Sequence, residues 1–250
     1  MTEDPGSTKE VAEATKSVAE FSSKLLDFFT RACGDIVEDT FGIFADKVRA
    51  YRTKKQLEFV TEIENDCRMR GFVIEKKIPL RLAWPIVVHG AEEDNESLRN
   101  MWKRLFVNAL DPSQASEIRK AFVSILQDLE PLDVILLDKL VKTTVFERTT
   151  TQYPAVTAKN VTQALVLDIR DVEAALDNLD RQGLASKYPL SGGVISDSSW
   201  TFGKGGYRCT ELGLRLWCAC SEEARSLELA REAQSKYRSE QEGMEEGKTS

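Results

Sequence analysis

The chain has 250 residues, of which 42% are hydrophobic and 30% are charged, and its formal net charge at pH 7 is −7. This is the composition of a folded globular protein, long enough to bury one large core or two smaller ones. The negative balance excludes a general attraction to nucleic acid or to anionic lipid.

The cysteines and the N-terminal residues indicate the compartment. Five cysteines occur without a CxxC pair, which suits a reduced setting better than a disulfide framework. The polar, acidic N-terminus lacks the apolar centre of a secretory signal, and no run approaches the roughly 18 apolar residues of a membrane span. We therefore expect a cytoplasmic protein without a membrane-spanning segment.

The first half of the chain has a helical pattern. Residues 1–18 lack large apolar anchors and are expected to form a disordered N-terminal tail. From residue 19 to residue 147, apolar residues recur at helical spacing between short connections, which predicts a helical domain. Gly71 is expected to end one helix, Pro79 to start another, and Pro85 to kink it or to open a second.

The segment SLRNMWKRLFVNALDP, residues 97–112, has the sharpest pattern in the chain. Its apolar residues lie at i, i+3, i+4, i+7, i+8 and i+11, which predicts a two-faced helix. Either Asp94 or Asn95 is expected to cap its start. On this pattern Trp102 is a core anchor.

Residues 155–221 differ in character from those before them. They follow the order helix, turn, helix, glycine-rich hairpin, helix, with Thr210 as the expected cap of the last helix, and this order is typical of a winged helix. Residues 222–250 predict a charged helix and a polar tail. The expected fold class is mostly α: an N-terminal helical array followed by a winged-helix-like α+β domain with a small β-hairpin.

We find no motif for catalysis, a cofactor or a metal. The single histidine, His89, lies in an apolar segment with prolines, which favours a packing or capping role. The glycine-rich residues 201–207 lack the length and the Ser/Thr of a phosphate-binding loop, and the cysteine spacings do not match a zinc site. We expect no enzyme activity, although a pocket of convergent polar groups around His89 would reopen that question.

The winged-helix-like domain could bind nucleic acid or another protein. The second helix of the winged-helix-like domain, residues 168–182, carries five acidic and two basic residues, a net charge of −3 that opposes contact with phosphates. The hairpin is mildly basic, and its candidate nucleic-acid contacts are Lys187, Lys204 and Arg208. We expect an unidentified protein partner, with DNA contact through the hairpin as the alternative.

Three segments resemble the abortive-infection alpha family of bacterial proteins, which are linked to phage resistance. They are GIFADKVRAYRTKKQLEFV (42–60), IPLRLAWPIVVHGAEEDNESLRNMWKRLFVNALDP (78–112) and FVSILQDLEPLDVILLDKL (122–140). The residues YRCTELGLRLWCAC (207–220) also look like the family's C-terminal segment. Positions that match the family's pattern include Arg49, Tyr51, Arg52, Trp102, Asn108, Asp111, Pro112, Pro131 and Asp133.

The resemblance implies a role in phage defence, with a phage or host component as partner, and implies nothing about catalysis; a homo-oligomer stays open. We interpret the matching residues as structural. Asn108 is expected to bond a backbone group of the turn that follows it. Asp111, directly before Pro112, is suited to cap the next helix.

Overall fold

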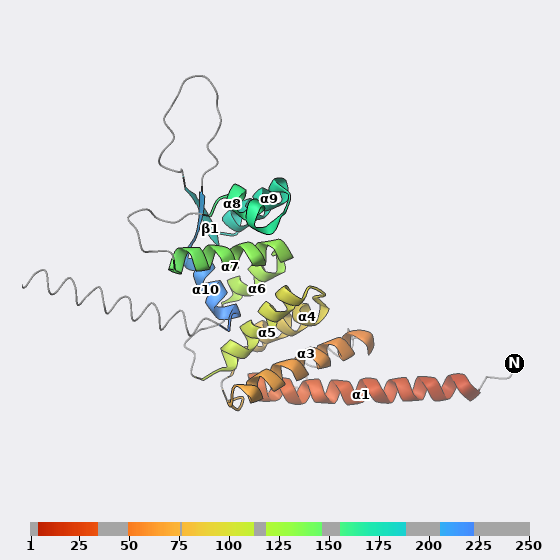
Figure 1. The fold of residues 1–250 in the computed structure, drawn as a ribbon. Helices are drawn as coiled ribbons and strands as arrows, with labels where there is room; N and C mark the ends of the chain where they lie inside the picture. The colour runs from red at the N-terminus through yellow and green to blue at the C-terminus, as the bar shows by residue number, and fades with distance from the viewer. Residues whose placement is uncertain are drawn as a thin grey trace, which may run out of the picture. The chain divides into compact units, whose positions relative to one another are not determined.

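The computed structural model describes residues 5–34, 50–75, 77–112, 119–146, 156–188 and 206–222. This part of the chain is mostly helical, with a small two-stranded antiparallel sheet near its C-terminal end (Figure 1). The predicted fold class, mostly α with a small hairpin, is confirmed.

The chain divides into two compact units, residues 1–129 and 130–250. The sequence placed the boundary later, between residues 147 and 155. The difference concerns one helix, α7 (Pro131–Phe146), which packs against elements that follow it in the chain. Helical periodicity predicts that a face of α7 is buried, but it cannot say which neighbours bury it.

The N-terminal unit is a series of helices around an aromatic core. In the described residues α1 packs on α3, α3 on α4 and α4 on α5, while α6 packs on α4. The ring centroids of Phe28 lie 5.5 Å from Phe29 and 5.6 Å from Phe106, within the range of favourable aromatic pairs. The bounds are α1 (Pro5–Cys33), α3 (Ala50–Met69), α4 (Leu80–Glu92), α5 (Glu96–Leu110) and α6 (Lys120–Gln127).

Helix α1 differs from the sequence-based expectation. A disordered tail was expected over residues 1–18, whereas α1 begins at Pro5. Proline is well suited to the first helical position, and the alanines and charged residues that follow it are strong helix formers. Helix propensity therefore accounts for a segment that has few large apolar side chains.

Two glycines shape the α3–α4 pair. Gly71 has φ +77° and ends α3, as predicted, because glycine adopts this left-handed conformation without strain. At Gly90, a Cβ atom would lie 2.3 Å from the Phe59 ring, so only glycine lets α3 and α4 approach this closely. Pro79 occupies the N-cap position of α4, without a side-chain hydrogen bond, and Pro85 lies inside that helix rather than opening a second one.

In the described residues, the C-terminal unit consists of α7, two short helices, a sheet and a last helix. Helix α9 packs on α7, α8 and β1, and α10 packs on α7. Trp217 Nε1 donates a hydrogen bond to Asp138 Oδ1 of α7 at 3.1 Å, and α7 also packs on β2, so α7 belongs with this unit. The other bounds are α8 (Ala158–Leu165), α9 (Ile169–Arg181), β1 (Ala185–Tyr188), β2 (Gly206–Cys209) and α10 (Glu211–Cys220).

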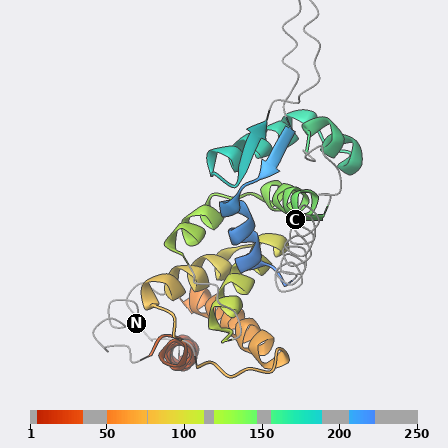
Figure 2. The same ribbon diagram turned by 90° about the vertical axis from the view of Figure 1, so that its left-hand side faces the viewer.

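The sheet is antiparallel, with Ala185 opposite Cys209 and Tyr188 opposite Gly206. Figure 2 shows its two strands side by side, with α10 following β2. Val156 adds a single antiparallel bridge to Tyr207, ahead of α8. The predicted order of two helices, two strands and a helix is present. Residues 223–250, expected to form a charged helix and a polar tail, lie outside the described residues.

Candidate functional site

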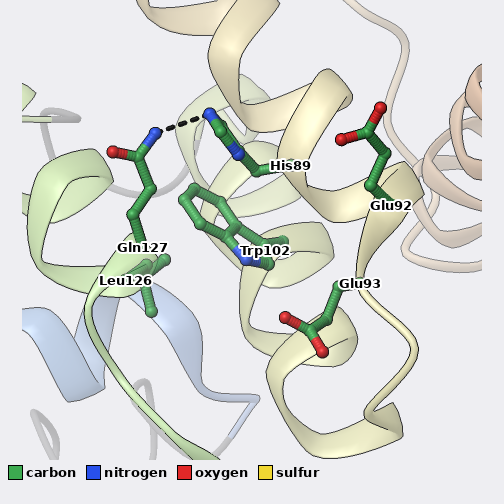
Figure 3. A pocket seen from close by; sticks show the side chains of 6 residues that line it. All are labelled: His89, Glu92, Glu93, Trp102, Leu126 and Gln127. Atoms are coloured by element: carbon green, nitrogen blue, oxygen red, sulfur yellow. Dashed lines mark hydrogen bonds between the residues drawn. The ribbon is translucent and has the colours of Figure 1, made fainter.

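Helices α4, α5 and α6 border a pocket of about 350 Å³ in the N-terminal unit (Figure 3). The pocket lies around His89. From the sequence, a pocket of polar groups at this residue was the one feature that would reopen the question of enzyme activity. Its lining combines an imidazole, two carboxylates, an amide and two apolar side chains: His89, Glu92, Glu93, Gln127, Trp102 and Leu126.

The His89 ring has a defined partner on each of two sides. It stacks on the Trp102 indole with a centroid distance of 5.8 Å and an interplanar angle of 26°. The Gln127 side-chain amide donates to Nε2 of the ring over 2.6 Å, which joins α4 to α6. A packing role for His89, as predicted, agrees with these contacts. To act as a general base through Nε2, the ring would first have to release Gln127.

The two glutamates lie on the other side of the indole from Gln127 in the view of Figure 3. Glu93 Oε1 accepts a hydrogen bond from the backbone N–H of Asn95 at 2.8 Å. Asn95 in turn caps α5, because its Oδ1 accepts from the N–H groups of Ser97 and Leu98. Of the two residues predicted as the N-cap, Asp94 and Asn95, the cap is Asn95, and Glu93 supports it.

The family-pattern residues of α5 take part in the core and in a polar network. Trp102 is 1% exposed, so its predicted role as a core anchor is confirmed. Asn108, also 1% exposed, accepts a hydrogen bond at Oδ1 from Arg70 Nη1 over 2.7 Å. Arg70 Nη1 also lies 3.9 Å from Asp111 Oδ2, so one guanidinium at the end of α3 serves both residues.

Asp111 was predicted to cap the next helix, but in the described residues the N-cap position of α6 is occupied by Arg119. Asp111 is the C-cap of α5, where its backbone N–H bonds the Val107 carbonyl oxygen, and α6 begins after Arg119 without a side-chain cap. The Asp111 carboxylate pairs with Arg70, 41 residues earlier, a partner that local sequence could not indicate. The turn with which Asn108 was expected to bond falls largely in residues 113–118, outside the described residues.

Pro131 and Asp133 together form the start of α7. Pro131 is the first helical residue. Asp133 Oδ2 accepts from the Glu130 N–H at 2.8 Å, the return bond of a capping box, and from Asn178 Nδ2 of α9 at 2.6 Å. Burial raises the pKa of the Asp133 carboxyl, while these two hydrogen bonds oppose the rise.

The three candidate nucleic-acid contacts lie in different environments. Lys187 on β1 has its ammonium 5.4 Å from the Tyr207 ring centroid and 3.7 Å from Asp177 Oδ1. Tyr207 and Asp177 raise the pKa of Lys187, and Tyr207 itself donates a hydrogen bond to Asp177 at 2.5 Å. Arg208 is half-buried on β2, opposite Ser186. Lys204 lies outside the described residues.

The remaining candidates lie at or next to helix ends, or outside the described residues. Pro112 is exposed after α5. Tyr51 and Arg52 lie in the first turn of α3, and Arg49 falls outside the described residues. Thr210 caps α10 as predicted, by accepting from the Gly213 N–H at 3.0 Å.

The cysteines are all free thiols. Burial raises the pKa of Cys33 to about 11 and that of Cys67 to about 12, and it raises the pKa of Cys220 strongly as well. Thiols with raised pKa values stay protonated at neutral pH and are poor nucleophiles and metal ligands. No three His, Cys, Asp or Glu side chains of the described residues come together as a metal site.

Fold and site together define a mostly helical protein of two units, in which buried polar contacts fix the helix ends. A family model described as abortive infection alpha matches residues 51–220, which is more than half of the chain. The protein belongs to the abortive infection alpha family. No curated protein and no solved structure matches the chain. Within the described residues, no helix combines the length and apolar character needed to cross a bilayer.

Proposed function

We propose that this protein acts in phage defence by binding another protein through its C-terminal unit, without catalysing a reaction. Its family membership supports a role in abortive infection. The binding mode is supported by one observation above all, the acidic exposed surface of α9. We place the protein in the cytoplasm, which agrees with its five free cysteines.

The C-terminal unit has the element order of a winged helix. Helix α7, the bridge at Val156, helices α8 and α9, and strands β1 and β2 follow one another as the helices and strands of that fold do. In such proteins the helix in the place of α9 reads DNA. Here residues 168–182 carry a net charge of −3, and Asp171, Asp177 and Asp180 are exposed. Repulsion from phosphates therefore favours a protein partner.

DNA contact through the hairpin is not favoured. The Lys187 ammonium already lies beside Asp177 and over the Tyr207 ring, and a phosphate would have to compete with both. The carboxylate of Asp177 would lie close to any phosphate bound there, and like charges repel strongly at short range.

Action without catalysis is supported by what the pocket residues already do. His89 is bonded to Gln127, and Glu93 is bonded to the residue that caps α5. Each contact joins or orders helices of the N-terminal unit. A structural role thus accounts for these side chains without a reaction.

The proposal is tested by phage challenge of a bacterial host that carries the gene, lacks it, or carries a variant. Charge reversal at two exposed acids of α9, Asp171→Lys with Asp180→Lys, should abolish protection because it reverses the charge of the binding surface. The matched control is Asp27→Lys, an exposed acid of α1 that should leave protection intact. Both proteins are checked for an unchanged melting temperature.

Three outcomes would contradict the proposal. Full protection by the α9 double variant would remove that surface from the function. Loss of protection in His89→Gln, with stability unchanged, would favour catalysis or ligand binding at the pocket instead. A gene that gives no protection against any phage tested would remove the defence role itself.

A further inference from the structure

The turn between α8 and α9 exposes an unusual run of apolar side chains. Of the seven large hydrophobic residues that are exposed in the described part of the chain, four fall within five consecutive positions here. Val166 is 90% exposed, and the other three are between 37% and 43% exposed. We call this group the α8–α9 knob; it consists of Leu165, Val166, Leu167 and Ile169.

The backbone conformation of Val166 is also unfavourable for valine, so the stability of the fold does not explain why valine is exposed here. Val166 has φ 55° and ψ 46° and is the one non-glycine residue of the described chain with positive φ. This left-handed conformation is disfavoured for L-residues and most of all for a β-branched one. Helices usually place glycine or asparagine there. The fold alone would be better served by a small or polar residue.

The knob is also held in place. The N–H groups of Val166 and Leu167 both bond the carbonyl oxygen of Thr162 and so close the end of α8. On the other side, Asp168 Oδ1 accepts from the Arg170 N–H at 2.8 Å and caps α9. An apolar group fixed between two capped helices loses little conformational freedom on binding. Strain and exposure at one rigid position point to a function outside folding.

We propose that the α8–α9 knob inserts into an apolar cleft of a partner protein whose rim carries lysine and arginine. The charges around the knob support this choice. Asp168 is paired with Arg170, but Asp171 is exposed, and α9 continues with further exposed acids. A basic rim would complement this surface, and opposite charges across an interface speed association and select partners.

Other occupants fit less well. Four side chains fall well short of the roughly 1,200 Å² that a stable interface buries, so two copies meeting through this patch alone would bind weakly. A buried anchor in a cleft, by contrast, can supply most of the affinity of an interface from a few residues. An anionic membrane surface would be repelled by the acids of α9.

This inference rests on the proposed function, because it names the chemistry of the partner. The first test replaces Val166 by glycine, which removes the side chain and relieves the backbone. We expect Val166→Gly to fold with an unchanged or higher melting temperature and to lose protection against phage by about tenfold or more, the loss typical of an interface hot spot. Val166→Asn, which also tolerates the left-handed backbone, should behave in the same way.

The matched control is Val73→Gly. Val73 is a valine of the N-terminal unit that is 75% exposed and lies outside the helices. Its replacement should leave protection unchanged. If Val166→Gly protects as well as the natural chain does, the inference fails while the proposed function stands. If the natural chain itself does not protect, the proposed function fails.

The second test identifies the occupant with a photo-crosslinking amino acid at position 166 or at position 73 of the full chain, in infected and uninfected cells. We expect an adduct from position 166 only, with another protein, mapping to a segment that combines apolar residues with Lys or Arg. An adduct with residues 223–250 of the same chain, with a second copy or with nucleic acid would overturn the proposal. Equal adducts from both positions would do the same.

Discussion

The two units place their most distinctive residues in opposite environments. In α5 of the N-terminal unit, Trp102 and Asn108, which help to make the family recognisable, are each 1% exposed and engaged inside the unit. In the C-terminal unit, the turn from α8 to α9 presents Val166 to solvent in a strained conformation. The comparison teaches that residues which make a family recognisable can be buried in the core, whereas an exposed residue that the fold does not need is the better candidate for function.

The largest effect is expected from opening the N-terminal core. Trp102→Ala should lower the free energy of unfolding by about 3–5 kcal/mol, the usual loss for a buried large aromatic. Denaturant unfolding of the full chain, followed by near-UV circular dichroism, measures the loss. Met69→Ala, at a position that is 78% exposed, is the control and should change little. A Trp102 variant as stable as the natural chain would mean that the indole does not anchor the core.

A smaller loss is expected from the polar network behind α5. Arg70→Met removes the charge-assisted hydrogen bond to Asn108 and the ion pair with Asp111, and should cost about 2 kcal/mol. Arg68→Met is matched to it, because Arg68 lies two residues away on α3 and is exposed. Chemical denaturation should separate the two variants; equal midpoints would show that the network adds no stability.

At the start of α7, Asp133→Ala should cost about 1–2 kcal/mol, because the Glu130 N–H loses its acceptor and so does the Asn178 amide. Asp133→Asn should be far milder, since one amide oxygen can replace Oδ2, which accepts both bonds. Thermal melts of the two variants give the comparison. If asparagine were as damaging as alanine, the negative charge rather than the acceptor atom would be what matters.

The natural chain and its Asp133→Asn variant should also differ in how their stability depends on pH. Burial raises the pKa of Asp133 in the folded chain. A raised carboxyl pKa means that this group's contribution is most favourable below its unfolded pKa of about 3.9 and declines as pH rises through the folded value. Relative to Asp133→Asn, the natural chain should therefore be more stable near pH 4 than near pH 7. Parallel melts at both pH values test this; a stability difference that is independent of pH would contradict it.

The smallest effect, with the opposite sign, is expected at the exposed turn. Val166→Gly should raise the free energy of unfolding by up to about 1 kcal/mol, because relief of the left-handed backbone outweighs the greater freedom of glycine in the unfolded chain. Thermal melts alongside Val73→Gly measure it. A clear loss of stability would show that the Val166 side chain serves the fold after all, and would break the comparison between the units.

Several local signals were interpreted correctly from the sequence, and distant partners were not. The cap of α5 was predicted to be Asp94 or Asn95 and that of α10 to be Thr210, because a cap depends on residues within one turn; the structure has Asn95 and Thr210. Arg70 could not be linked to Asn108, since the two are 38 positions apart and only the packing of α3 on α5 joins them. Likewise, nothing local marked Gln127 as the partner of His89.

The knob escaped the sequence for a different reason. A turn was expected between α8 and α9, but the order of the elements does not tell whether the apolar side chains of that turn are buried or exposed. Propensity also predicts glycine, not valine, in a left-handed position. Only the structure shows that Val166 is exposed, because exposure depends on whether other elements of the unit cover the turn.

The assignment of α7 to the second unit has a practical consequence for dissecting the protein. Chimeras between relatives, or separately expressed halves, should be joined or cut between Leu129 and Glu130, where each half keeps its own interior. The sequence alone would place the junction in the polar stretch near residue 150. That junction would separate Trp217 from its hydrogen-bond acceptor Asp138 and would remove α7, on which α9, α10 and β2 pack.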